Sequence, residues 1–114
     1  MKRYVFLADL KNETETINRY KKCHENIPQE VLNHLPQNGV VHMEIYHLGN
    51  RLVNIMDVDE SYTGENLVCR VNVHPAVEAW DQLTTDMMQP LPFEGCGQKW
   101  ELAEMLYSRN NHIL

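Results

Sequence analysis

The sequence predicts an α+β fold, because segments with the patterns of strands and helices alternate along a short chain. The order of these patterns is strand, helix, strand, strand, helix, strand. With 114 residues, 43% of them hydrophobic and 23% charged, the chain has the length and composition of one compact, soluble globular domain. We therefore expect residues 1–114 to form a single domain.

The first predicted strand and the helices after it occupy the N-terminal third of the chain. Residues 4–10 are aromatic, β-branched and apolar, which is typical of a buried strand. Asn12 offers an N-cap with Glu15 three residues later, so a helix is expected to begin there. Pro28 suits the first position of a following helical piece, which the turn at residues 36–39 is expected to end.

A β-hairpin is predicted in the middle of the chain. Two strand-like segments, residues 40–48 and 52–58, flank the short loop Gly49-Asn50-Arg51. The second segment is apolar on both faces, with Leu52, Met56 and Val58 on one and Val53 and Ile55 on the other. Since antiparallel sheets usually leave one face to water, we expect helices to cover one face and a second subunit to cover the other.

The C-terminal half predicts one more helix and one more strand. Residues 67–73 are rich in β-branched valine, and the pattern does not decide whether this segment is a strand or a helix. Pro75 can begin a helix whose core-facing stripe comprises Ala76, Trp80, Leu83 and Met87. An irregular connection rich in proline and glycine, residues 90–97, then leads to an alternating last strand at residues 99–107. This order is the split βαβ arrangement of ferredoxin-like domains, with a four-stranded antiparallel sheet.

Charge and cysteine content exclude several classes of protein. Sixteen acidic and ten basic residues give a net charge of -6, which disfavours nucleic acid as a partner. The three cysteines, Cys23, Cys69 and Cys96, form no Cys-x-x-Cys pair, so reduced thiols in the cytoplasm are expected. Neither a membrane span nor a signal peptide is recognisable in the sequence.

Tyr20 and His24 are the first candidates for a functional site. They lie four residues apart in a predicted helix and therefore on one helical face. A phenol and an imidazole on one face could bind a polar ligand and exchange a proton with it. From spacing alone, His24 could equally be an ordinary histidine at a helix end, and Trp80 on its apolar stripe could be a packing residue.

Several segments together resemble one enzyme family. The segments KRYVFLADLK, RYKKCH, EIYHLGNRL, QPLP and KWELAEMLY occur in the same order in the L-rhamnose mutarotases, and the resemblance spans nearly the whole chain. It implies a small homodimeric α/β-barrel enzyme that interconverts the α and β anomers of a 6-deoxy sugar without a cofactor or a metal. L-Rhamnose is the implied substrate, with L-fucose or another deoxyhexose as the alternative.

The resemblance also implies roles for particular residues. The proton-donor histidine of the family falls on His24, its substrate-binding tyrosine on Tyr20, and its tryptophan on Trp80. Two further substrate-binding positions, where family members can carry aromatic residues, hold Met43 and Asp81 in this chain. Histidine suits mutarotation because its ordinary pKa of about 6.5 allows it to give or take a proton near neutrality.

The sequence does not decide the roles of several other residues with polar or reactive side chains. A second proton carrier could be Glu44, Tyr46, Asp57 or Glu104. Cys23 is expected to point to another helix face than His24, and His42 and His47 are expected on opposite faces of a strand, which prevents a joint metal site. A non-catalytic, dimeric ligand-binding module and a barrel oxygenase are the competing functions, since this fold hosts many activities.

Overall fold

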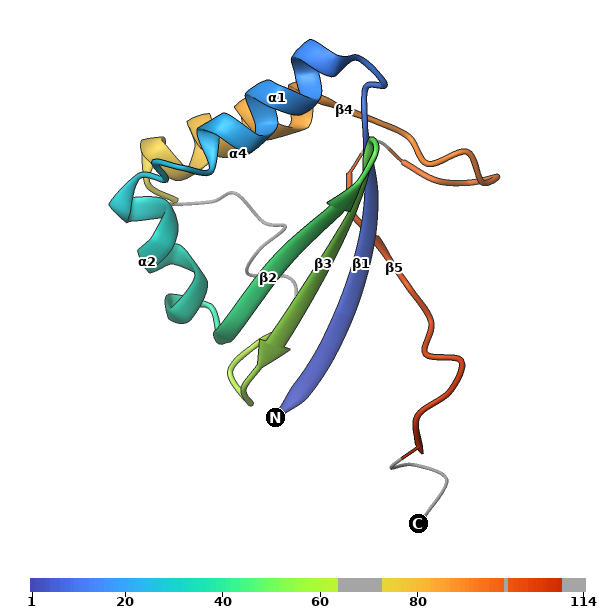
Figure 1. Ribbon diagram of the computed structural model, residues 1–114. Coiled ribbons are helices and arrows are strands. Elements are labelled where there is room, and N and C mark those ends of the chain that lie inside the picture. The colour runs from blue at the N-terminus through green and yellow to red at the C-terminus, as the bar shows by residue number, and fades with distance from the viewer. Residues whose placement is uncertain (64–72, 98, 110–114) are drawn as a thin grey trace.

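The computed structural model describes residues 1–63, 73–97 and 99–109 (Figure 1). In these ranges the elements are β1 (Lys2–Leu10), α1 (Thr14–Cys23), α2 (Gln29–Gln37), β2 (Val40–Leu48), β3 (Arg51–Val58), α4 (Pro75–Asp86), β4 (Met88–Gln89) and β5 (Glu101–Leu102). The segment at residues 67–73, which the sequence left open between strand and helix, lies almost wholly outside the described residues.

The strands form one antiparallel sheet in the order β2-β3-β1-β4, and β5 also pairs with β1. The helices α1, α2 and α4 all lie on the same side of this curled sheet (Figure 1). The predicted α+β, ferredoxin-like fold is therefore confirmed, in the form of a half-barrel. Because the helices of the described ranges cover only one face, any ligand held between helices and sheet must contact the inner face, and none of these helices covers the outer face.

The register of the hairpin determines which side chains reach the inner face. In β3, Leu52 and Met56 are almost fully buried, whereas the intervening Val53 and Ile55 are half-exposed on the outer face. The predicted division of the apolar residues of this strand between its two faces is thus confirmed. The loop is shorter than expected, because Arg51 already pairs with Leu48 and belongs to β3.

Two hydrophobic clusters lie between the helices and the inner face. The first cluster contains the buried residues Ala8, Leu10, Tyr20, Leu52, Met87 and Met88. The second cluster contains Val40, Met56 and Val58, with Leu35 of α2 and Met43 of β2 packed against it. The first cluster thus connects α1 and the end of α4 to the sheet, while the second connects α2 to it.

The start of α1 differs from the prediction. The helix begins at Thr14 with Glu13 as N-cap, so Asn12 is not the cap. The hydroxyl of Thr16 donates to Oε1 of Glu13 over 2.9 Å, a local contact that supports the later start. Because neighbouring polar residues all suit the first turn, sequence pattern places a helix start only to within a residue or two.

Gly39 allows the tight connection between α2 and β2. Its φ of +86° lies in the left-handed region that favours glycine, and a Cβ atom at this position would lie 2.6 Å from the main-chain nitrogen of Tyr62. The carbonyl of Gly39 also accepts a hydrogen bond of 2.8 Å from the Asp59 amide. The end of α2 and the end of β3 are therefore held together where a side chain has no room.

The C-terminal predictions are only partly correct. Of the predicted stripe in α4, Met87 is buried and Ala76 and Trp80 are partly buried, whereas Leu83 is 39% exposed and the buried Val77 was not predicted. The last strand is limited to Glu101–Leu102, which pair with Leu7 and Phe6 of β1. One further main-chain hydrogen bond joins Ala103 to Val5, and the described residues beyond it leave the sheet.

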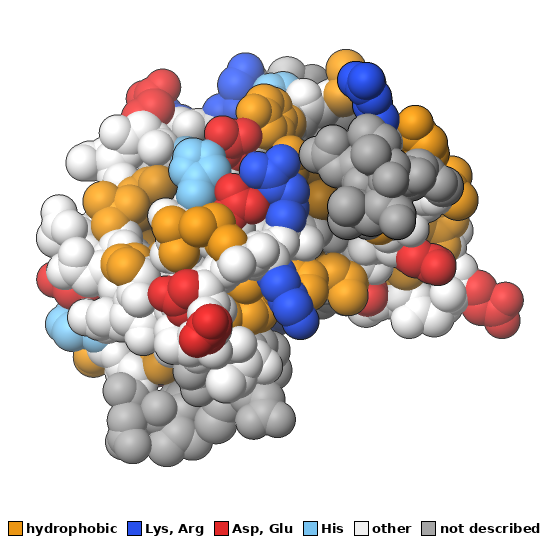
Figure 2. Space-filling view, turned by 90° about the horizontal axis from the view of Figure 1, so that it is seen from below, with side chains coloured by type: hydrophobic (Ala, Val, Ile, Leu, Met, Phe, Trp, Pro, Cys, Tyr) orange, Lys and Arg blue, Asp and Glu red, His pale blue; other side chains and the backbone are white. Residues whose placement is uncertain are grey.

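No helix within the described ranges is long and apolar enough to cross a membrane. Figure 2 shows the end of the molecule where the N-terminus lies, with acidic and basic side chains next to one another and hydrophobic ones between them. The described side chains visible on this face form no extended patch of a single charge (Figure 2).

Candidate active site

His24 is anchored at the C-terminus of α1 by the helix itself. It is the C-cap residue, and its Nδ1 lies 2.8 Å from the carbonyl oxygen of Tyr20. Since a carbonyl oxygen only accepts hydrogen bonds, Nδ1 must carry a hydrogen in this contact. In the neutral imidazole the other nitrogen, Nε2, then holds the lone pair, and it has no hydrogen-bond partner in the described part of the chain.

The imidazole of His24 lies between two aromatic rings. The ring centre of Tyr20 is 4.4 Å from that of His24, and the Trp80 ring of α4 meets the imidazole edge-on at 5.0 Å. Such contacts restrict the rotation of the imidazole and shield its sides from water. The structure thus brings together the three residues that the sequence singled out first, from α1 and α4.

Tyr20 is the most deeply buried of these three residues, at 5% exposure, and belongs to the first hydrophobic cluster. Burial raises the pKa of its phenol well above the ordinary value near 10. The phenol therefore stays protonated near neutral pH. It can donate or accept a hydrogen bond, but it is a poor base.

Cys23 lies closer to the imidazole than the sequence predicted. Its Sγ is 3.1 Å from the Tyr20 carbonyl and 3.4 Å from Nδ1 of His24, so the expectation that it points away from His24 is wrong. Burial raises the pKa of this thiol, which disfavours the reactive thiolate. Cys23 therefore shares the carbonyl that anchors His24, and it shows no sign of a nucleophile.

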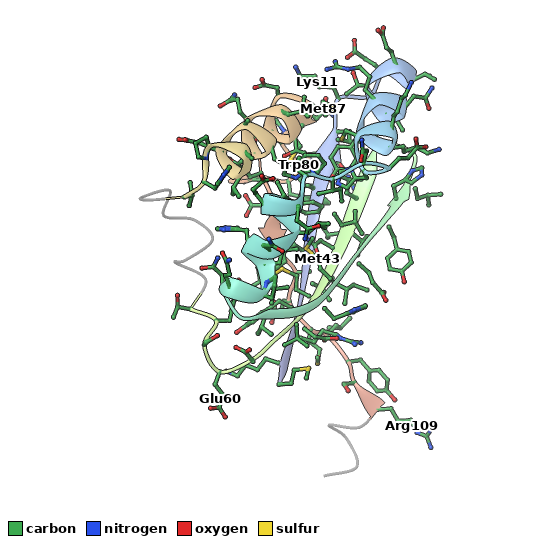
Figure 3. All side chains as sticks on the ribbon, turned by 90° about the vertical axis from the view of Figure 1, so that its left-hand side faces the viewer. Lys11, Met43, Glu60, Trp80, Met87 and Arg109 are labelled. Carbon is green, nitrogen blue, oxygen red and sulfur yellow. The ribbon has the colours of Figure 1, made fainter. Side chains whose placement is uncertain are left out.

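Met43 lies on the inner face of β2, as expected for a residue that could contact a ligand. It packs against the second hydrophobic cluster, and it lies with Trp80 on the helix side of the sheet (Figure 3). Asp81 follows Trp80 in α4, and its carboxylate accepts a hydrogen bond of 3.2 Å from Lys99 Nζ.

Three candidates for the second proton carrier face the opposite side of the sheet. Glu44 pairs with the outer-face residue Ile55 and accepts hydrogen bonds from Tyr46 at 2.7 Å, while Asp57 accepts from Arg3 at 2.7 Å. Hydrogen bonds from Tyr46 and His42 lower the pKa of Glu44. Glu104 lies in the exposed segment after β5. These residues are therefore not brought to His24.

The two strand histidines face opposite sides, as predicted. His42 is paired with Asp57 on the outer face, and His47 is paired with Leu52 on the inner face. Among the described residues no group of three histidine, cysteine or acidic side chains could hold a metal ion.

Asn54 is a buried polar residue that the sequence patterns did not single out. Asn54 is 6% exposed in the middle of β3, between Leu52 and Met56 on the inner face. Its Oδ1 is buried and has no hydrogen-bond partner in residues 1–63, 73–97 and 99–109. The signal was present in the sequence as a polar residue at an inward position of an alternating strand.

Solved structures first identify the class of the fold. The crystal structure of an L-rhamnose mutarotase from Formosa agariphila is similar with a TM-score of 0.68 and 22% identity, covering 95% of this chain and 98% of that chain. Tetracenomycin F2 cyclase from Streptomyces glaucescens is similar with a TM-score of 0.55 and 16% identity, covering 95% of this chain and 96% of that one. These likenesses show a ferredoxin-like half-barrel of the kind found in mutarotases and cyclases.

Sequence comparison then identifies the family. Residues 3–108 match the family model described as L-rhamnose mutarotase. A protein described as L-fucose mutarotase, from Xanthomonas campestris pv. campestris, is 30% identical over 115 residues, covering 99% of this chain and 92% of that protein. The chain therefore belongs to the L-rhamnose mutarotase family, and its class is that of sugar mutarotases, which are isomerases.

Proposed function

We propose that this protein interconverts the α and β anomers of L-rhamnose or a close 6-deoxyhexose, with His24 as the acid-base residue. The observation that carries this proposal is the anchored imidazole, whose Nδ1 donates to the Tyr20 carbonyl over 2.8 Å while Tyr20 and Trp80 flank the ring. This arrangement directs Nε2 of His24, which carries the lone pair, away from the Tyr20 carbonyl. A positioned imidazole of this kind is suited to proton transfer near neutral pH.

Mutarotation requires a proton to leave one oxygen of the sugar and another oxygen to receive one. The anomeric hydroxyl loses its proton, the bond between the anomeric carbon and the ring oxygen breaks, and the ring oxygen is protonated, giving the open aldehyde. Rotation of the aldehyde and the reverse steps close the ring as the other anomer. His24 Nε2 would take the first proton and return it to the ring oxygen, so that the reaction needs no redox partner and no net proton.

The neighbours of His24 have supporting roles in this proposal. The buried phenol of Tyr20 stays protonated and would hydrogen-bond a sugar hydroxyl. The Trp80 ring would pack against the C–H face of the sugar. Met43 and Asp81 would distinguish between L-rhamnose and L-fucose, because an apolar and an acidic side chain replace aromatic ones at these positions.

The outer face of the sheet is the proposed interface of a homodimer. Val53 and Ile55 lie there as half-exposed apolar residues of the central strand, and no helix covers them in the described part of the chain. The charged groups around them are already neutralised in pairs, such as Arg3 with Asp57 at 2.7 Å. Sedimentation velocity tests the interface: wild type should be a dimer and Ile55→Arg a monomer, whereas a dimeric Ile55→Arg variant would contradict it.

A cytoplasmic location is proposed on the basis of the free thiols of Cys23 and Cys96. Cell fractionation with an antibody against the protein would test it, and recovery in a secreted fraction would contradict it.

Saturation-transfer NMR tests the proposed activity. Exchange between the anomeric proton signals is measured for L-rhamnose, L-fucose and their C-2 and C-4 epimers, with and without catalytic amounts of protein. We expect faster exchange for at least one 6-deoxyhexose. Thermal stabilisation by a sugar without faster exchange would instead indicate a binding module and would contradict the proposed catalysis.

A further inference from the structure

Asn54 interrupts an otherwise apolar inner face at the centre of the sheet. In β3 the flanking inward residues, Leu52 and Met56, are 1% and 4% exposed, and Asn54 between them is 6% exposed. Across the sheet Asn54 is paired with Phe6 of β1 and Ile45 of β2, which are also apolar. The amide therefore lies in apolar surroundings on all four sides within the sheet.

The position of Asn54 coincides with the boundary between the two hydrophobic clusters. Leu52 belongs to the first cluster and Met56 to the second. Ile45, the neighbour of Asn54 on β2, packs against the first cluster, which includes Tyr20. Asn54 thus faces the same layer between helices and sheet as the aromatic group around His24.

The amide oxygen of Asn54 has no partner to offset its burial. Oδ1 is shielded from solvent and accepts no hydrogen bond from the described residues. A buried polar atom without a partner is costly, and natural proteins keep few of them without a functional reason. By contrast, the amide of Asn50 is used for structure, since its Nδ2 donates to the Leu10 carbonyl over 2.8 Å.

We propose that Asn54 is a substrate-binding residue whose Oδ1 accepts a hydrogen bond from a sugar hydroxyl group. The proposal extends the mutarotase function proposed above and rests on it for the identity of the ligand as a polyhydroxylated six-membered ring. A site that makes one directed hydrogen bond to a hydroxyl discriminates against sugars that lack or invert that hydroxyl. Asn54 would therefore contribute to the choice of sugar, while His24 carries out proton transfer.

Substitution by leucine separates a binding role from a structural one. Leucine has a branched end of similar shape but no polar atom, so Asn54→Leu removes the unpartnered oxygen and joins the two clusters. We expect its melting temperature to equal or exceed that of wild type and its dissociation constant for the sugar to rise about fivefold. The matched control Asn50→Leu loses a real structural hydrogen bond, so it should melt lower and bind the sugar as wild type does.

The decisive measurement uses deoxy sugars. Dissociation constants from NMR titration are compared for wild type, Asn54→Leu and the smaller Asn54→Ala, with the bound sugar and its 2-, 3- and 4-deoxy analogues as probes. If Asn54 contacts one hydroxyl, both variants lose affinity for the parent sugar, and they match wild type for the analogue lacking that hydroxyl. Unchanged affinity in both variants, or an equal loss for every analogue, would overturn the proposal.

The same data distinguish failure of this proposal from failure of the proposed function. If wild type binds a sugar without accelerating anomer exchange, and the analogue pattern still identifies one hydroxyl, mutarotation is wrong and the Asn54 contact stands. If exchange is accelerated but the analogue pattern is flat, mutarotation stands and the Asn54 contact is wrong. Absence of any sugar binding by wild type overturns both.

Discussion

Replacement of His24 by asparagine tests the acid-base role while preserving the contact that anchors the side chain. The Nδ2 atom of asparagine can take the place of Nδ1 and donate to the Tyr20 carbonyl, which lies 2.8 Å from Nδ1 in the structure. An amide, however, does not titrate near neutrality. The variant therefore keeps the local geometry of the helix end and loses the group that would transfer the proton.

The expected effects on rate and stability differ greatly in size. Loss of a positioned acid-base group costs about 10²- to 10⁴-fold in rate, or roughly 3–5 kcal/mol of transition-state stabilisation. The variant also loses the edge contact with Trp80 at 5.0 Å. Such a contact contributes about 0.5–1.5 kcal/mol, which corresponds to a fall in Tm of roughly 2–6 °C for a chain of this size.

Saturation-transfer NMR on L-rhamnose or L-fucose measures the rate, and uncatalysed exchange in buffer gives the baseline. The companion variant His24→Gln can place an amide near Nε2 but cannot keep the anchoring donor, so it should lose exchange equally and melt lower than His24→Asn. Exchange within about threefold of wild type in a folded His24→Asn protein would refute the reasoning, since an effect of 10²-fold or more is expected.

Three further predictions concern stability. Leu52→Ala, at a position only 1% exposed, should lower the free energy of unfolding by about 2–5 kcal/mol in urea titrations, whereas Leu106→Ala, at 97% exposure, should change it by less than about 0.5 kcal/mol. Hydrogen bonds from Arg3 lower the pKa of Asp57 in the folded protein. The pair should therefore stabilise the fold fully above about pH 4, the ordinary pKa of an aspartate, and this stabilisation should be lost as the pH falls through the lowered pKa of the folded state. The Tm difference between wild type and Asp57→Asn should accordingly shrink on acidification, and a constant difference would contradict the pairing. Gly39→Ala should lower the free energy of unfolding by about 1–3 kcal/mol in the same urea titrations, because φ is +86° and a Cβ atom would clash with the main-chain nitrogen of Tyr62. An unchanged urea midpoint would contradict this prediction and would show that the turn relaxes.

Local features were predictable to different degrees. The hairpin was predicted to within one residue, because turn chemistry and alternating side chains define strand pairing locally. The start of α1 was misplaced by one residue, with Glu13 rather than Asn12 as the N-cap, because sequence pattern defines a helix start only to within a residue or two. The position of Cys23 was also misjudged, because the side-chain rotamer and the carbonyl it contacts are not encoded by helical spacing.

The extent of the last strand could not be read from the sequence. Residues 99–107 alternate well enough for a long strand, yet only Glu101–Leu102 pairs with β1. A strand needs a neighbouring strand as well as an alternating pattern, and how long the segment stays beside β1 depends on the path of the chain in three dimensions. The same dependence on distant elements explains why Val77, rather than Leu83, is the buried residue of α4.

The sequence by itself determined the α+β order, the hairpin and the pairing of Tyr20 with His24, because each follows from the periodicity of a single segment. Tertiary structure decided that the Trp80 ring meets the imidazole, that Glu44 and Asp57 face away from it, and that Oδ1 of Asn54 is buried without a partner among the described residues. These outcomes depend on contacts between elements far apart in the chain. Burial and hydrogen-bond satisfaction are properties of such contacts, so they exist only once helices and sheet have packed together.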